Sequence, residues 1–113
     1  MTIKKHTISF VHAVQGLRYA LKSQPNFIVH LTLSTVVIIL GIIQKIDSTS
    51  WAILSLTIGG GLTIELINTS LENLTDLVQP EYHLLAKQAK DTAAAAMLVY
   101  AIAAVVIAVF IFL

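Results

Sequence analysis

The sequence contains no cysteine and few charged residues, and both shortages limit what it can encode. Without cysteine there are no disulfides, no thiol nucleophiles and no thiolate metal sites. Charged residues are 12% of the 113-residue chain, whereas soluble domains carry about 25%. The net charge of +1 gives no sign of a polyanionic partner, so no nucleic acid is expected to bind. A soluble, thiol-dependent or nucleic-acid-binding protein is therefore not expected.

The chain has apolar sequence in abundance instead, with 57% hydrophobic residues and a mean hydropathy of +0.85. Three apolar spans cover residues 27–44, 51–76 and 92–113, and roughly 20 helical residues cross a bilayer core. The second span is too long to lie wholly in hydrocarbon, so one of its ends should emerge into water. We predict a single-domain, all-α membrane protein over residues 1–113, with three transmembrane helices.

Residues 7–22 show a different pattern, in which apolar and polar side chains form separate helical stripes. Ile8 and Val11 belong to the apolar stripe, and His12 and Gln15 to the polar one. This amphipathic pattern is typical of a helix that lies on a membrane surface. A helix packed against other protein is the alternative, and little of the chain lies outside the spans to provide such a partner.

Lysine and arginine are distributed unequally around the predicted spans. Six of them precede the first or the third span: Lys4, Lys5, Arg18, Lys22, Lys87 and Lys90. Only Lys45 lies in the short turn between the first and second spans. Because Lys and Arg accumulate in cytoplasmic segments, we predict a multi-pass membrane protein with a cytoplasmic N-terminus and an external C-terminus.

Acidic side chains line one face at the end of the second span. At about 100° per residue, Glu65, Glu72 and Asp76 fall within a sector of about 40°. An ionised group facing lipid at the depth of Glu65 would cost ~2.5 kcal/mol or more. These acids should therefore face protein, water or a cation. Carboxylates at the cytoplasmic rim are suitable Mg²⁺ ligands, and a deeper acid can act as a general base; packing carboxylates neutralised by lysine or protonation are the alternative.

The segment between the second and third spans carries cations next to these acids. Its Pro80–Glu81 pair predicts the start of a helix. One helical face of that segment holds His83, Lys87 and Lys90, with Asp91 following at once. Lysines near carboxylates and a metal can contact phosphate oxygens, although a flank for lipid headgroups is the simpler interpretation of Lys87 and an interfacial polar residue that of His83. No phosphate-binding glycine loop occurs, which excludes a soluble kinase fold.

Two stretches, IELINTSLENLTDLV (64–78) and EYHLLAKQAKDTAAAA (81–96), resemble the bacterial diacylglycerol kinase/undecaprenol kinase family. The resemblance extends from about Phe10 to the end of the chain and includes Gly16–Arg18 and Asn26–Phe27. It implies a small lipid kinase of the bacterial cell membrane that transfers the γ-phosphate of ATP to a lipid alcohol, with Mg²⁺. It also implies a homotrimeric bundle in the lipid bilayer, with active sites between subunits.

The resemblance also implies roles for single residues. Glu65 matches the proposed catalytic base, Asn68 matches its neighbour in the site, and Glu72 matches a metal-binding glutamate. The nucleotide-side positions are Asp76, His83, Lys90 and Asp91.

One position departs from the family pattern. Where the family usually has a second metal-binding glutamate, spacing from Gly16 places Gln24. Glutamine offers a carbonyl oxygen without charge, so it is a weaker metal ligand. Reduced metal affinity and a weakly active or inactive variant are both consistent with this change. His30, in the first span, is interpreted as a tolerated polar residue.

The segments NTSLE (68–72) and KDTAAAA (90–96) are more similar to the undecaprenol-type members than to the diacylglycerol type. The sequence therefore predicts phosphorylation of undecaprenol to undecaprenyl phosphate. Production of phosphatidic acid from diacylglycerol is the first alternative. An ion-translocating membrane subunit is a further one, because aligned acids also mark ion pathways.

Overall fold

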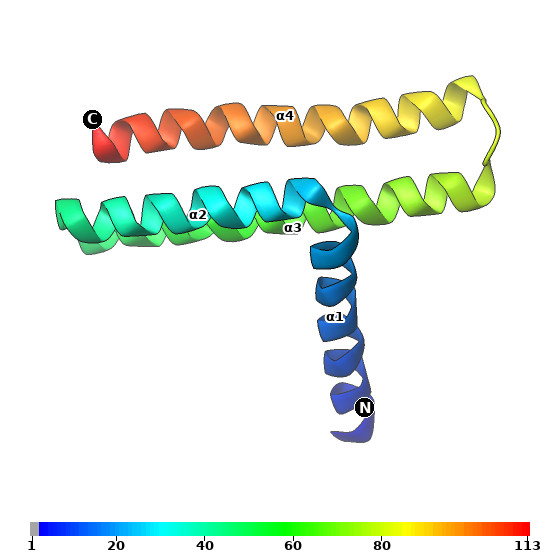
Figure 1. The fold of residues 1–113 in the computed structure, drawn as a ribbon, viewed down its shortest axis with the longest axis horizontal. Helices are drawn as coiled ribbons and strands as arrows, with labels where there is room; N and C mark the ends of the chain where they lie inside the picture. Colours follow the sequence, from blue (N-terminus) through cyan, green and yellow to red (C-terminus); the bar gives the residue numbers. More distant parts are fainter. Residues whose placement is uncertain (1–2) are drawn as a thin grey trace.

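Four helices make up the computed structural model, which describes residues 3–113 and their side chains from Ser9 onward. They are α1 (Ile3–Ser23), α2 (Pro25–Gln44), α3 (Ser48–Val78) and α4 (Leu84–Phe112). Helices α2, α3 and α4 run side by side along the long axis, while α1 projects steeply from them (Figure 1). Lys4 and Lys5, which were counted in the charge asymmetry, lie outside the described side chains. The all-α prediction is confirmed, because residues 3–113 contain no strand.

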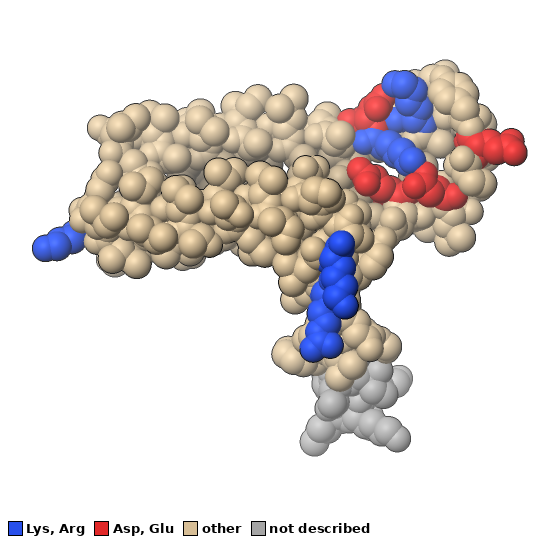
Figure 2. Space-filling view, in the orientation of Figure 1, with Lys and Arg blue, Asp and Glu red and all other residues tan. Residues whose placement is uncertain are grey.

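Helices α2, α3 and α4 are each long and apolar enough to cross a membrane. At ~1.5 Å per residue, the 31 residues of α3 extend beyond a hydrocarbon core of about 30 Å. In Figure 2, acidic and basic side chains gather over the α3–α4 turn, while the body of the bundle is uncharged on the face shown. The predicted emergence of one end of the second span into water agrees with this arrangement.

The short turn between α2 and α3 is closed by local capping. Lys45 adopts a left-handed conformation, with φ of 54°, and its backbone N–H closes the end of α2. Asp47 then caps α3 by accepting a hydrogen bond of 2.8 Å from the backbone N–H of Ser50. The hydrogen bonds from Ser50, first from its side chain and then from its backbone, lower the pKa of Asp47. This cap explains why α3 begins three residues before the predicted span.

Helix α4 differs most from its predicted bounds. The apolar span was expected at 92–113, whereas α4 begins at Leu84, because the polar residues before the span continue the same helix. The expected helix start at Pro80–Glu81 is wrong by several residues. His83 is the N-cap instead, and its Nδ1 accepts a hydrogen bond of 3.1 Å from the backbone N–H of Leu85.

Helix α1 contacts the bundle through its C-terminal end. Ala20 is buried, and the Tyr19 hydroxyl accepts a hydrogen bond of 3.1 Å from Asn73 Nδ2 of α3. Farther from the bundle, apolar side chains of α1 remain exposed, and Phe10 is 72% exposed. Among its described side chains, α1 therefore presents uncovered apolar groups between Phe10 and Leu21, as expected for a helix on a membrane surface.

Helices α3 and α4 meet where α3 contains three consecutive glycines. The Tyr100 hydroxyl of α4 donates a hydrogen bond of 2.7 Å to the backbone carbonyl of Thr57. Its ring lies against Gly60 and Gly61, where a Cβ atom would touch it. The absence of side chains at these two positions allows the close approach, in line with the prediction that small residues permit helix contact.

Candidate active site

Glu65 lies inside the bundle, on the face of α3 that is turned away from lipid. Its side chain is 1% exposed, whereas Ile67, Leu71 and Leu74, on the opposite face, are exposed. The predicted separation of an inward polar face from an outward apolar face is therefore confirmed for this part of α3. Glu65 Oε2 has no hydrogen-bond partner, so a buried carboxylate oxygen is left able to accept a proton or a hydrogen bond.

Asn68 lies between Glu65 and Glu72 on the same face of α3. Its side chain is 8% exposed, and its Nδ2 donates a hydrogen bond of 3.1 Å to Glu72 Oε1. Its Oδ1 is buried without a hydrogen-bond partner. Glu72 itself is half-buried. The site thus passes from a buried carboxylate, through an amide, to a carboxylate that water can reach.

Two unpartnered buried oxygens in one turn of helix need a physical reason, because buried polar groups are nearly always hydrogen-bonded. Glu65 Oε2 and Asn68 Oδ1 are both acceptors, so they suit a ligand that donates a hydrogen bond or carries positive charge. The adjacent Glu72 adds a carboxylate. This oxygen donor set fits a hard cation such as Mg²⁺, which commonly takes one or two carboxylates and completes its shell with phosphate oxygens and water.

A charged cluster lies beyond these residues, where α3 and α4 approach the turn. Lys90 of α4 forms an ion pair with Asp76 of α3, and Lys87 Nζ lies 2.5 Å from Asp91 Oδ2 within α4. A cleft of about 340 Å³ is lined by Asp76, Gln79, Tyr82, His83, Lys87 and Lys90, among others. The fold therefore brings together the predicted nucleotide-side positions Asp76, His83 and Lys90. Asp91 instead faces Lys87 along the same helix.

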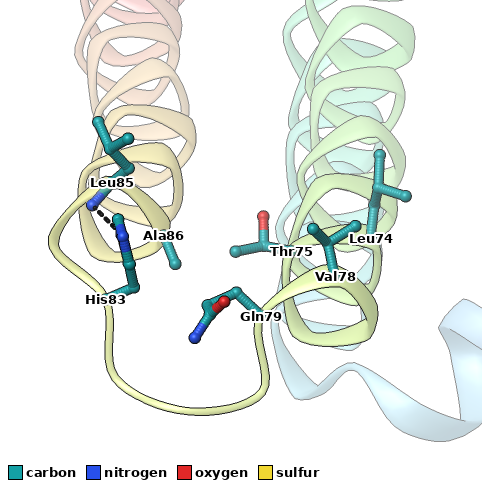
Figure 3. A pocket seen from close by; sticks show the side chains of 7 residues that line it. All are labelled: Leu74, Thr75, Val78, Gln79, His83, Leu85 and Ala86. Carbon is teal, nitrogen blue, oxygen red and sulfur yellow. Dashed lines mark hydrogen bonds between the residues drawn. The ribbon is translucent and has the colours of Figure 1, made fainter.

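His83 caps the N-terminus of α4 and also lines the two clefts beside it. Figure 3 shows its ring bonded to the backbone of Leu85, next to a second cleft between the ends of α3 and α4. This cleft of about 380 Å³ is lined mainly by apolar groups: Leu74, Thr75, Val78, Gln79, His83, Leu85 and Ala86. Because Nδ1 accepts from Leu85, the neutral ring carries its proton on Nε2, where it can donate to a ligand.

Gln24 lies at the junction between α1 and α2. It is the N-cap of α2 and is half-buried, but its side chain makes no capping hydrogen bond. In the part of the chain that the structure describes, no group of three or more His, Asp or Glu side chains could hold a metal. Glutamine is not among these residue types, so the pairing of Gln24 with Glu72 at one metal stays a prediction.

The sequence interpretation of His30 as a tolerated polar residue missed its proximity to Glu65. Its Nε2 lies 3.6 Å from Glu65 Oε2, which is too long for a hydrogen bond and short enough for an ion pair. A polar, titratable residue within an apolar span was the available signal, because such residues usually face the bundle interior. The sequence could not show which side chain it meets.

Comparisons with known proteins show the family to which the chain belongs. Residues 11–112 match the family described as prokaryotic diacylglycerol kinase. The chain is 39% identical over 105 residues to the undecaprenol kinase of Bacillus subtilis (strain 168), covering 93% of this chain and 85% of that protein. It is 42% identical over 101 residues to a diacylglycerol kinase of Synechocystis sp., covering 88% of this chain and 58% of that protein.

A diacylglycerol kinase of Helicobacter pylori is 34% identical over 88 residues, which cover 78% of this chain and 69% of that protein. The family match over residues 11–112 spans α2, α3 and α4. The protein therefore belongs to the prokaryotic diacylglycerol kinase family.

Proposed function

We propose that this protein is a membrane lipid kinase that transfers the γ-phosphate of ATP to the hydroxyl of undecaprenol, with diacylglycerol as the alternative acceptor. The observation that carries the proposal is the buried, unpartnered Glu65 Oε2, which lies on the same helical face as Asn68 and Glu72. Family membership supports the reaction class. Similarity to the undecaprenol kinase of Bacillus subtilis supports undecaprenol, and similarity to the diacylglycerol kinases supports diacylglycerol.

The depth of these residues suits two substrates of opposite polarity. Glu72 follows Glu65 by seven positions, which corresponds to about 10 Å along a helix. Glu65 is buried within the apolar part of α3, whereas Glu72 and the charged cluster lie toward the turn. The depth of Glu65 therefore matches that of the hydroxyl of a lipid alcohol, while the phosphates of ATP would remain at the water-facing end.

In the proposed reaction, Glu65 Oε2 accepts the proton of the lipid hydroxyl. The oxygen of that hydroxyl then bonds to the γ-phosphorus, the bond from this phosphorus to the bridging β–γ oxygen breaks, and ADP leaves with that oxygen. Asn68 Oδ1 is placed beside Glu65 to orient the hydroxyl, while its amide group holds Glu72. Lys90 offsets negative charge on the phosphoryl group in transfer.

Glu72 is the residue that we expect to hold Mg²⁺, with Gln24 as a weaker, uncharged second ligand. When bound, this ion would neutralise charge on the phosphate oxygens of ATP. Asp76, His83 and Asp91 are proposed to contact the nucleotide. Of these, His83 has an Nε2 proton to donate, because its Nδ1 is occupied by the helix cap.

We further propose a homotrimer in a bacterial cell membrane, with a cytoplasmic N-terminus and an external C-terminus. In its most apolar stretch, α4 has no buried residue, so this part of the helix is available to contact lipid or another subunit. The charged groups gathered over the α3–α4 turn support a cytoplasmic position for that end (Figure 2).

Phosphorylation with radiolabelled ATP in defined vesicles tests the function, with undecaprenol and diacylglycerol as parallel acceptors. Glu65→Gln should keep the fold and nucleotide binding but lose at least about 100-fold in kcat, the range for removal of a general base. Asp47→Asn is the matched control, because it makes the same carboxylate-to-amide change at the far end of α3 and asparagine caps helices equally well.

Undiminished turnover in Glu65→Gln would remove the assignment of the base. Absence of ATP-dependent phosphorylation of either lipid by the unaltered protein would reject the function itself. A cation flux in vesicles without phosphorylation would favour an ion pathway, although the gathering of charge at one end of the bundle argues against a continuous path.

A further inference from the structure

We propose that His30 is a positioning residue for Glu65, holding the carboxylate of the base from the neighbouring helix. His30 Nε2 lies 3.6 Å from Glu65 Oε2. The two residues come from α2 and α3, so their proximity depends on how these helices pack. The inference rests on the proposed function, because it assigns His30 a role only if Glu65 is the base.

The surroundings of Glu65 explain why such a group is needed. Two nearby hydrogen-bond donors on its own helix are already engaged, because Asn68 Nδ2 donates to Glu72 and the Thr69 hydroxyl donates to the Glu65 backbone carbonyl. Glu65 Oε2 has no hydrogen-bond partner. Among the ion pairs that the structure records for the described side chains, His30 is the partner of Glu65.

The imidazole is itself held by packing. A Cβ atom at Gly61, one turn before Glu65, would lie 3.6 Å from His30 Nδ1 and 3.4 Å from a ring carbon of Tyr100. The His30 ring of α2 and the Tyr100 ring of α4 therefore both pack against α3 at Gly61, which has no side chain. The hydrogen bond from Tyr100 to the Thr57 carbonyl fixes the second ring. His30 is thus placed by the fold, with its Nε2 directed to the carboxylate.

A base that takes a proton from a substrate hydroxyl must be held near one orientation. Productive geometry needs placement within about 0.5 Å, and a displacement of about 1 Å can lower a rate roughly 100-fold. A glutamate side chain has three rotatable bonds, so without an anchor its carboxylate would sample several orientations. An imidazole beside the carboxylate restricts this sampling, while Oε2, which has no hydrogen-bond partner, remains able to accept the proton of the lipid hydroxyl.

Two polar substitutions that differ in side-chain length test the proposal. In His30→Gln the side-chain amide nitrogen can occupy the place of Nε2, whereas in His30→Asn it is one methylene too short. We expect kcat for lipid phosphorylation to fall roughly 100-fold in His30→Asn and less than about tenfold in His30→Gln, because the longer amide keeps a donor near Oε2. The KM for MgATP should change less than about twofold in both, since His30 lies away from the charged cluster.

Controls separate positioning from stability. His12→Gln changes an exposed histidine of α1 that is outside the proposed site, and it should leave kcat unchanged. Thermal unfolding in the same detergent should be similar for His30→Asn and His30→Gln. In a Glu65→Gln background, His30→Asn should lower the residual rate no further, because the group that it positions is already absent.

Each outcome bears on a different claim. Equal kcat in His30→Asn, His30→Gln and the unaltered protein would overturn the positioning role. An equal further loss from His30→Asn in the Glu65→Gln background would overturn it too, because the two residues would then act independently. Normal turnover in Glu65→Gln alone would instead reject the base in the proposed function, whatever the His30 variants show.

Discussion

The triple glycine of α3 allows a sharp test of how α3 and α4 pack, because its three members meet different surroundings. A Cβ atom at Gly59 would have nothing within 4 Å, and at Gly61 it would make ordinary contact with Tyr100 at 3.4 Å. At Gly60 it would overlap the Tyr100 hydroxyl and lie 2.9 Å from ring carbon Cζ. Single alanine substitutions along one turn should therefore have unequal effects.

The magnitudes follow from packing and helix propensity. Gly60→Ala forces α4 away from α3 or displaces Tyr100, and overpacking of this kind costs about 1–3 kcal/mol. It also endangers the hydrogen bond from Tyr100 to Thr57, and such interhelical bonds in membranes contribute about 0.6 kcal/mol on average. Gly59→Ala adds a side chain in open space, so it should be neutral or stabilise α3 by up to about 1 kcal/mol.

Unfolding of the purified protein in mixed detergent micelles measures these differences. We expect Gly60→Ala to be the least stable, Gly61→Ala to be intermediate and Gly59→Ala to match or exceed the unaltered protein. Tyr100→Phe should recover part of the loss in Gly60→Ala, because it removes the atom that the new Cβ would overlap. Equal destabilisation at Gly59 and Gly60 would refute the described contact between α3 and α4.

Three further predictions concern charged and polar groups. Gln24→Glu should raise lipid kinase activity at limiting Mg²⁺, because a carboxylate is a stronger ligand than an amide; a Mg²⁺ titration that is unchanged would contradict a metal role at this position. Lys90→Ala should lower kcat at least tenfold while changing the free energy of unfolding by less than about 1 kcal/mol, since its ion pair with Asp76 is exposed; parallel rate and unfolding measurements check this. The cap at Asp47 has a lowered pKa in the folded state, so its stabilisation is present above the ordinary value and is lost as the pH falls through the folded-state pKa. Asp47→Asn should remove that part of the acid dependence of unfolding while keeping α3 capped, and an identical acid profile would show that the cap contributes nothing.

Local pattern was enough to predict much of this protein. Hydropathy and length identify α2, α3 and α4, because a helix that crosses a bilayer must be apolar over about 20 residues wherever its neighbours lie. The helical period likewise places Glu65, Asn68 and Glu72 on one face, and the structure turns that face inward. These are properties of single segments, so one sequence contains them.

Contacts between helices were decided by the tertiary structure alone. That His30 meets Glu65 and that Lys90 meets Asp76 depends on the rotation and axial register of one helix against another. A hydropathy pattern leaves both variables open, because many rotations bury an equally apolar surface. The close approach of α3 and α4 at the glycines, and the choice of His83 as the cap of α4, follow from the same packed arrangement of helices and turn.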